Sequence, residues 1–260
     1  MKLFDKLTKN NKILCIICLI SVLILIWSLY SNNLFERFEI ASALTQVTNG
    51  NNFEYPNLYY INLEKRKDRK KHIEEELKKI DYPRNKINRV NAVNMPGNRT
   101  GCSLSHNKAL EEGLKQDDDY IIVLEDDFEW IHDKEKTLDV LKNAVNTKNW
   151  NVIILACNGN SRNYNKYLNK VIQCQTRSGY IIKKSYIPNL LKVWKDNVNI
   201  RLKYNISKTN SYKQYNDTNT AGDQCWKILQ NDKWFSVTPI LGKQMKSYSD
   251  LEKKVVDYNV

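Results

Sequence analysis

Glycine and proline are scarce in this sequence, with 8 and 5 copies in 260 residues. Such low contents exclude a collagen-like chain and a long disordered chain rich in these two residues. No segment repeats another at a fixed period. Hydrophobic residues make up 42% and charged residues 27% of the chain, which is typical of a globular protein with one or two domains.

Metal-binding cysteine pairs are missing from most of the chain. Cys15 and Cys18 lie inside an apolar run, where they act as small apolar side chains. The other four cysteines have no CxxC spacing, which makes a zinc site unexpected, and they allow three disulfide pairings that the sequence does not decide; they are Cys102, Cys157, Cys174 and Cys225.

Nucleic-acid recognition signatures are also missing. The formal net charge is +12, which could serve nucleic acid, anionic lipid or a phosphorylated ligand. The chain has no zinc finger, RNA-recognition signature or arginine stripe. The charge therefore indicates a solvated basic surface, and we expect no nucleic-acid partner.

The longest uncharged apolar run covers residues 13–30, just enough to span a bilayer. Four lysines precede it, which predicts a cytosolic amino terminus. We expect a single-pass type II membrane protein with a cytosolic tail (1–12), an uncleaved anchor (13–30), a stem (31–55) and a lumenal, ER- or Golgi-type domain (56–260). A cleaved signal peptide is the alternative, but the run is longer than a signal core.

Strand-like and helix-like segments alternate after the stem, which predicts a single α/β domain with a mostly parallel central sheet. We expect Ser103 to cap the second helix and a long polar loop to cover 197–220. The predicted strands are 58–63, 86–93, 120–124, 152–156, 178–182 and 234–238, and the predicted helices are 67–80, 104–116, 133–147, 187–194 and one from Gly222.

Three consecutive acids, Glu125, Asp126 and Asp127, follow the apolar strand 120–124. Ligands of open α/β sheets bind beyond the carboxyl ends of strands. In extended backbone Glu125 and Asp127 point to the same side, and a pair of carboxylates suits Mg²⁺ or Mn²⁺ together with substrate phosphates. The alternative is a solvated strand end or a helix cap.

Further motifs accompany the acidic triplet in a fixed order. They are YINLE (60–64), NRVNA (88–92), GCSLSH (101–106), SGYII (178–182), Gly222-Asp223, VTP (237–239) and QMKSYSD (244–250). Their order and spacing resemble glycosyltransferase family 25, the lipopolysaccharide and collagen galactosyltransferase group. The resemblance runs from about residue 58 to 251.

This resemblance implies a GT-A (Rossmann-like) fold, a nucleotide-sugar donor, a divalent metal ion and inversion at the anomeric carbon. It places the triplet where the family has its Asp-x-Asp equivalent. Asp127 is then the expected metal ligand, and Glu125 or Asp126 would contact the metal or the ribose.

The donor is expected to meet residues from both ends of the domain. Arg66 and Arg69 could pair with phosphate or stack on the base, or they could begin a solvated helix. Asn62 and Leu63 would contact the base through backbone groups. The family's carboxyl-terminal motif adds two residues for diphosphate or metal, Gln244 and Ser249.

Two further residues have an ordinary and a functional interpretation. His106 shares a helix face with Leu110 and Leu114, so it is either a hydrogen-bonded core histidine or part of the donor pocket. Asp223 is either a helix cap or the general base that takes the proton of the acceptor hydroxyl. Asp250 is a weaker candidate for the base.

The expected function is transfer of a hexose, galactose or glucose, from a UDP-sugar with Mn²⁺ or Mg²⁺. The acceptor would be a glycan, a lipid-linked sugar (glycolipid) or a protein hydroxyl (glycoprotein). The alternative is a catalytically inactive, glycosyltransferase-like module that binds glycans. A metal-dependent phosphoesterase would usually need more histidine and carboxylate ligands.

Overall fold

The computed structural model describes Trp27 and residues 53–95, 98–230, 233–250 and 253–257. The domain begins at Phe53. The predicted tail, anchor and stem therefore lie almost wholly outside the described residues. Within the described ranges, no helix combines the length and the apolar character that crossing a bilayer requires.

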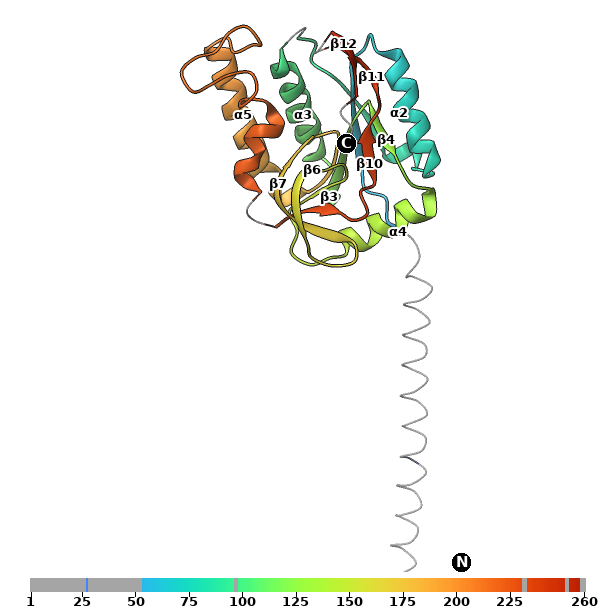
Figure 1. Ribbon diagram of the computed structural model, residues 1–260. Coiled ribbons are helices and arrows are strands. Elements are labelled where there is room, and N and C mark those ends of the chain that lie inside the picture. Colours follow the sequence, from blue (N-terminus) through green and yellow to red (C-terminus); the bar gives the residue numbers. More distant parts are fainter. Residues whose placement is uncertain (1–26, 28–52, 96–97, 231–232, 251–252, 258–260) are drawn as a thin grey trace, which may run out of the picture. The chain divides into compact units, whose positions relative to one another are not determined.

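An eight-stranded sheet forms the centre of the domain, in the order β2-β1-β3-β8-β5-β9-β7-β6 (Figure 1). Six of the eight strands point the same way, and β8 and β7 run opposite to them. The α/β class is thus confirmed, with a mixed and largely parallel sheet. The strands are β1 (Leu58–Asn62), β2 (Ile87–Asn91), β3 (Tyr120–Glu125), β5 (Val152–Ile154), β6 (Asn158–Asn163), β7 (Leu168–Gln175), β8 (Gly179–Lys183) and β9 (Trp234–Val237).

Helices cover both faces of the sheet. They are α2 (Lys67–Lys79), α3 (Arg99–Gly113), α4 (Lys134–Val145), α5 (Ile187–Lys203) and α6 (Gly222–Cys225), with short 3₁₀ turns at Arg84–Lys86, Lys184–Tyr186 and Trp226–Leu229. In Figure 1, α2 and α4 lie on one side of the sheet and α3 and α5 on the other.

Two helix boundaries differ from the prediction. Ser103 does not cap α3, because the Oδ1 of Asn98 accepts the backbone N–H of Thr100 and starts the helix earlier. The predicted loop 197–220 is helical up to Lys203. The apolar spacing of Trp194 and Val198 keeps an inward face on α5 beyond the predicted end.

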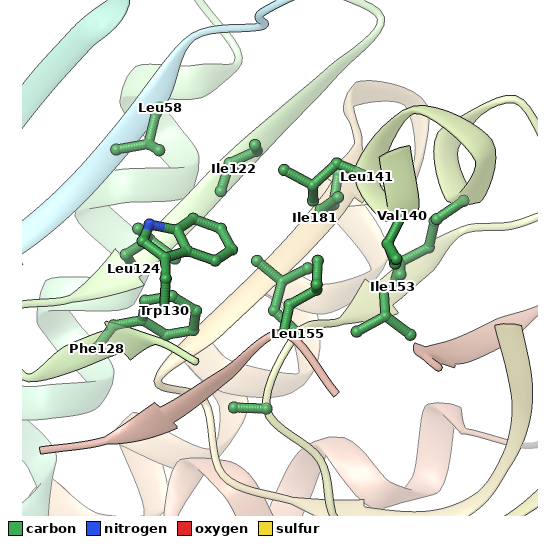
Figure 2. Close-up of a cluster of buried hydrophobic side chains, with 14 of the residues drawn as sticks. Leu58, Ile122, Leu124, Phe128, Trp130, Val140, Leu141, Ile153, Leu155 and Ile181 are labelled. Carbon is green, nitrogen blue, oxygen red and sulfur yellow. The ribbon is translucent and has the colours of Figure 1, made fainter. Parts of the chain in front are cut away.

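Side chains of the strands alternate between two hydrophobic layers, as the two-residue period of a strand requires. In β3, Ile122 and Leu124 pack with α2 and α4 in one layer (Figure 2). Ile121 and Val123 pack with α3 and α5 in the other. The central strands are therefore buried on both faces, whereas β6 at one side of the sheet is exposed.

Short strands absent from the prediction complete the domain. β10 (Gly242–Gln244) pairs with β4 (Phe128–Trp130), so that Gln244 lies opposite Phe128. β11 (Ser247–Ser249) pairs with β12 (Lys254–Val256). The β6–β7 hairpin was also missed, and the disulfide Cys157–Cys174 connects the loop before β6 to β7. Cys102 and Cys225 are free thiols.

Candidate active site

The carboxyl ends of the parallel strands β1, β2 and β3 meet at one edge of the sheet, where a cleft of about 220 Å³ opens. Because β8 is antiparallel to β3, its amino end lies at the same edge, with Gly179 opposite Leu124. Nine residues predicted from the sequence line this cleft: Leu63, Arg66, Arg69, Glu125, Asp126, Asp127, Gln244, Ser249 and Asp250. The cleft occupies the place expected for a ligand of an open α/β sheet.

Asp126 is fully engaged by protein groups. Its carboxylate accepts from the Nδ2 of Asn62 at 2.7 Å and pairs with the Nη1 of Arg69 at 3.1 Å. The Oδ1 of Asn62 accepts two bonds from Arg89, which fixes the amide orientation. Asn62 therefore orients the acidic triplet from behind and does not line the cleft. Asp126 has little capacity left for a metal ion.

Glu125 and Asp127 converge on one point. The Nε2 of Gln244 lies 3.4 Å from the Oε2 of Glu125 and 3.5 Å from the Oδ1 of Asp127. Asp127 is buried and Glu125 is half-buried, and Arg69 is the one cation that pairs with Asp127 in the described part of the chain. Burial and the neighbouring Glu125 and Asp126 raise the pKa of Asp127 to about 7, although Arg69 opposes the shift.

This donor set fits a hard divalent cation. It offers two carboxylates, the ligand type that Mg²⁺ and Mn²⁺ prefer, and Gln244 could add its Oε1 if its amide, which now presents Nε2 to both carboxylates, turned over. The raised pKa of Asp127 reflects negative charge without enough compensation, which a cation at this point would supply. The predicted pair of ligands, Asp127 and Glu125, is the pair that the fold brings together.

Arg66 and Arg69 face the cleft, and both are tied to the carboxyl-terminal hairpin. The carbonyl of Tyr248 accepts from the Nη1 of Arg66 and the Nη2 of Arg69, each at 3.0 Å. Arg66 also pairs with Asp250 at 2.6 Å. This engagement of Asp250, which also binds Lys65 at 2.7 Å, makes it a poor general base.

His106 is a hydrogen-bonded core histidine beneath the cleft. Its Nε2 lies 2.9 Å from the Oε1 of Glu125, and its Nδ1 lies 3.2 Å from the Tyr180 hydroxyl. Burial and the nearby charge of Arg177 lower the pKa of His106 to about 4. At neutral pH the uncharged ring donates from Nε2 to an ionised Glu125 and accepts from Tyr180. His106 therefore holds Glu125 in place.

Sequence reasoning missed two residues behind Glu125. Cys102 lines the cleft, and its thiol lies 3.5 Å from the Oε1 of Glu125 and 3.2 Å from the Nη2 of Arg177. Ligand atoms of Cys102, His106 and Glu125 lie within 4.8 Å of one another. The guanidinium beside the thiol disfavours a metal ion at this point, since two positive charges would be adjacent.

Asp223 lies in α6 and does not line the cleft. It is close enough for its charge to act on Cys102, His106 and Arg177. Cys102 and Arg177 are thus close to both Asp223 and Glu125. Arg177 gives no motif of its own in the sequence, because its place depends on the antiparallel direction of β8.

A family model described as glycosyltransferase family 25 (LPS biosynthesis protein) matches residues 81–218. No curated protein matches the chain.

Three solved structures share a broad likeness. A197 from STIV is 12% identical, covering 77% of this chain and 93% of its own, with a TM-score of 0.40. A glycosyltransferase involved in the glycosylation of the major capsid of PBCV-1 is 9% identical, covering 77% of this chain and 97% of its own, with a TM-score of 0.44. A Drosophila β-1,4-galactosyltransferase 7 mutant, in complex with manganese, UDP-Gal and xylobiose, is 11% identical. It covers 78% of this chain and 76% of its own, with a TM-score of 0.35. No conclusion about this chain rests on such low scores.

Proposed function

Because this chain belongs to glycosyltransferase family 25, we propose that it transfers a hexose, galactose or glucose, from a UDP-sugar to an acceptor hydroxyl with inversion. The observation that carries the proposal is the convergence of Glu125 and Asp127 at the buried edge of a sheet, beside two arginines. The acceptor class is a glycan, a glycolipid or a protein hydroxyl. The topology, with the acidic triplet after β3 of a mixed sheet, supports a GT-A fold.

Metal binding is assigned to Asp127 and Glu125, with Gln244 beside them. Mn²⁺ or Mg²⁺, when bound, would offset the charge that develops on the departing UDP. Asn62, His106 and Asp126 act indirectly, since they hold the two ligand carboxylates and Arg69 in place. Three carboxylates with Arg69 leave net negative charge in the cleft, which favours a divalent cation over a bare diphosphate.

Diphosphate binding is assigned to Arg66 and Arg69, whose guanidinium groups can pair with phosphate oxygens. Leu63 and Ser249 line the same cleft and would contact the nucleotide. Both arginines bind protein carboxylates here, so the diphosphate must compete for their N–H groups or share them. Metal binding to Asp127 would release part of Arg69 for this purpose.

Asp223 is the proposed general base. An inverting displacement needs one group to take the acceptor proton on the side opposite the leaving UDP. Asp223 is half-buried, belongs to a different element from the metal ligands and is close enough for its charge to act on Cys102, which lines the cleft. The acceptor hydroxyl would give its proton to a carboxylate oxygen of Asp223 as its oxygen bonds to the anomeric carbon.

The location proposed for the enzyme follows from the sequence alone. The apolar run 13–30 and the lysines before it support a type II anchor, with the catalytic domain in a secretory-type lumen. The disulfide Cys157–Cys174 supports an oxidising compartment.

A donor screen on the purified full-length chain tests the function. UDP-galactose, UDP-glucose and other nucleotide sugars are supplied with Mn²⁺, with Mg²⁺ or with EDTA, and released nucleotide is measured. We expect release with one UDP-hexose, dependent on the metal ion. Asp127→Asn should lower it by about 100-fold or more, because the metal contributes several kcal/mol. Asp139→Asn, an exposed carboxylate on α4, is the matched control.

Three outcomes separate the hypotheses. Metal-dependent release that Asp127→Asn abolishes and Asp139→Asn preserves supports the transferase. Tight UDP-sugar binding without release, with acceptors of all three classes present, favours the inactive module. Absence of both binding and release contradicts the proposal.

A further inference from the structure

Arg177 is a buried cation that the roles above leave unexplained. It directly precedes Ser178 and β8, and its exposed fraction is 7%. Its Nη2 donates to the thiol of Cys102 at 3.2 Å, and its guanidinium carbon lies 5.2 Å from the centre of the Trp194 ring. No carboxylate forms an ion pair with it in the described ranges, and its buried Nη1 has no hydrogen-bond partner there. A charge buried in this way normally has a bonded counter-charge.

Gly222, the first residue of α6, packs directly against this guanidinium. A Cβ at Gly222 would lie 2.0 Å from the Nη1 of Arg177, so any other residue at this position would displace the guanidinium. The carbonyl of Gly222 accepts from the Nε1 of Trp194 at 2.9 Å. Arg177 thus packs between the indole of Trp194 and the backbone of Gly222, the residue before Asp223.

The charges around Arg177 come from opposite sides. Glu125, at the end of β3, and Asp223, in α6, both attract it, and Cys102 lies between Arg177 and Glu125. His106 is the other titratable group close by, and it is uncharged at neutral pH. The guanidinium is therefore a fixed positive charge between the proposed metal ligand and the proposed base.

We propose that Arg177 is a positioning residue for sugar transfer, which holds the start of α6, and with it Asp223, at a fixed place relative to the Glu125 edge of the cleft. The inference rests on the proposed function and on Asp223 as its base. Arg177 contacts neither the cleft nor the donor site directly. Its loss should therefore impair the transfer step and leave nucleotide binding nearly intact.

The test combines Arg177→Met, Arg177→Lys, Asp223→Asn and the double variant Arg177→Met/Asp223→Asn in the full-length chain. Transfer rates at saturating donor are measured beside the Kd of UDP with Mn²⁺, and circular dichroism confirms folding.

We expect Arg177→Met to lower kcat by at least about 30-fold with the Kd within about threefold. Arg177→Lys should retain more activity than Arg177→Met. The double variant should be no slower than the slower single variant, because both changes disable one unit. Arg162→Met, an exposed arginine on β6, is the control.

Gly222→Ala provides a second route if Arg177→Met does not fold. The added methyl group displaces the guanidinium and removes no charge. A lower kcat with an unchanged Kd is again expected.

The inference is overturned if Arg177→Met keeps more than a third of the wild-type kcat, if the effects of Arg177→Met and Asp223→Asn multiply, or if the Kd of UDP rises in proportion to the loss. In each of these cases the wild type is active, so the proposed function stands. A wild type that releases no nucleotide from any donor contradicts both.

Discussion

Two regions of the domain bury arginines in different ways. At the end of α5, every nitrogen of the Arg201 guanidinium has an acceptor. Nε binds Thr100, Nη1 binds Thr220, and Nη2 pairs with Asp217 at 2.7 Å. This group, the Arg201 clamp, connects α5, the loop after it and the start of α3.

The cleft and the residues next to it are different. The Nε of Arg69, which lines the cleft, and the Nη1 of Arg177, which lies beside Cys102, are buried and have no partner among the described residues. Most buried polar groups in folded proteins are hydrogen-bonded, and the exceptions need a reason. The clamp is complete without a ligand and stabilises the fold. The cleft retains unused donors and excess negative charge, which is what a substrate site requires.

The largest effect expected from this contrast is on stability. Arg201→Met should lower the free energy of unfolding by about 3–5 kcal/mol, because Asp217 loses a buried partner. Arg177→Met should change it by about 1 kcal/mol or less, since no carboxylate is bonded to Arg177. Urea unfolding of the two variants measures the difference. Equal losses would show that Arg177 also serves as a structural clamp.

A smaller effect is expected in the pH dependence of metal binding. The pKa of Asp127 is raised from 3.8 to about 7, mainly by burial, so the fold loses stability as the pH rises from about 4 to about 7, and the full cost of the ionised carboxylate is present above pH 7. A divalent cation removes this cost by replacing the proton. The affinity for Mn²⁺ should therefore rise about tenfold from pH 6 to pH 8.

Isothermal titration with Mn²⁺ at both pH values checks this expectation. Asp139→Asn should show the same rise as the wild type. An affinity that is flat over this range, or that falls with increasing pH, contradicts the electrostatic description of the cleft.

The smallest expected effect concerns two helix caps. Asp133 caps α4 through the backbone N–H of Lys136, and Asn98 caps α3 through that of Thr100. Removing either cap by substitution with alanine should cost about 1 kcal/mol. Asn98→Ala should cost more than Asp133→Ala, because Asn98 also accepts from Arg201 at 3.3 Å. Thermal unfolding of the matched pair tests whether the Arg201 clamp extends to this cap.

The acidic edge of the cleft could be predicted because its signal is local. An apolar strand that stops at three acids needs no tertiary information to place Glu125 and Asp127 at a strand end. The alternation of strands and helices gave the α/β class for the same reason. Gln244 and Ser249 were found through the family resemblance, since they end strands of only three residues that no periodicity reveals.

What the sequence could not provide depends on strand direction and on competition between caps. Arg177 lies beside Cys102 at the cleft only because β8 runs opposite to β3, and a run such as SGYII has the same appearance in either direction. The start of α3 was misplaced because Ser103 and Asn98 are both good caps, and the contact of Asn98 with Arg201 favours the earlier one.

The shared acceptor for Arg66 and Arg69 has one more consequence. It is the main-chain oxygen of residue 248, whereas the Tyr248 side chain is 49% exposed. The hydrogen bonds that connect Arg66 and Arg69 to the carboxyl-terminal hairpin therefore do not depend on which amino acid occupies position 248. A substitution at residue 248 can change the side chain that an acceptor meets at the rim of the cleft. The two guanidinium groups keep their hydrogen bonds and stay in place.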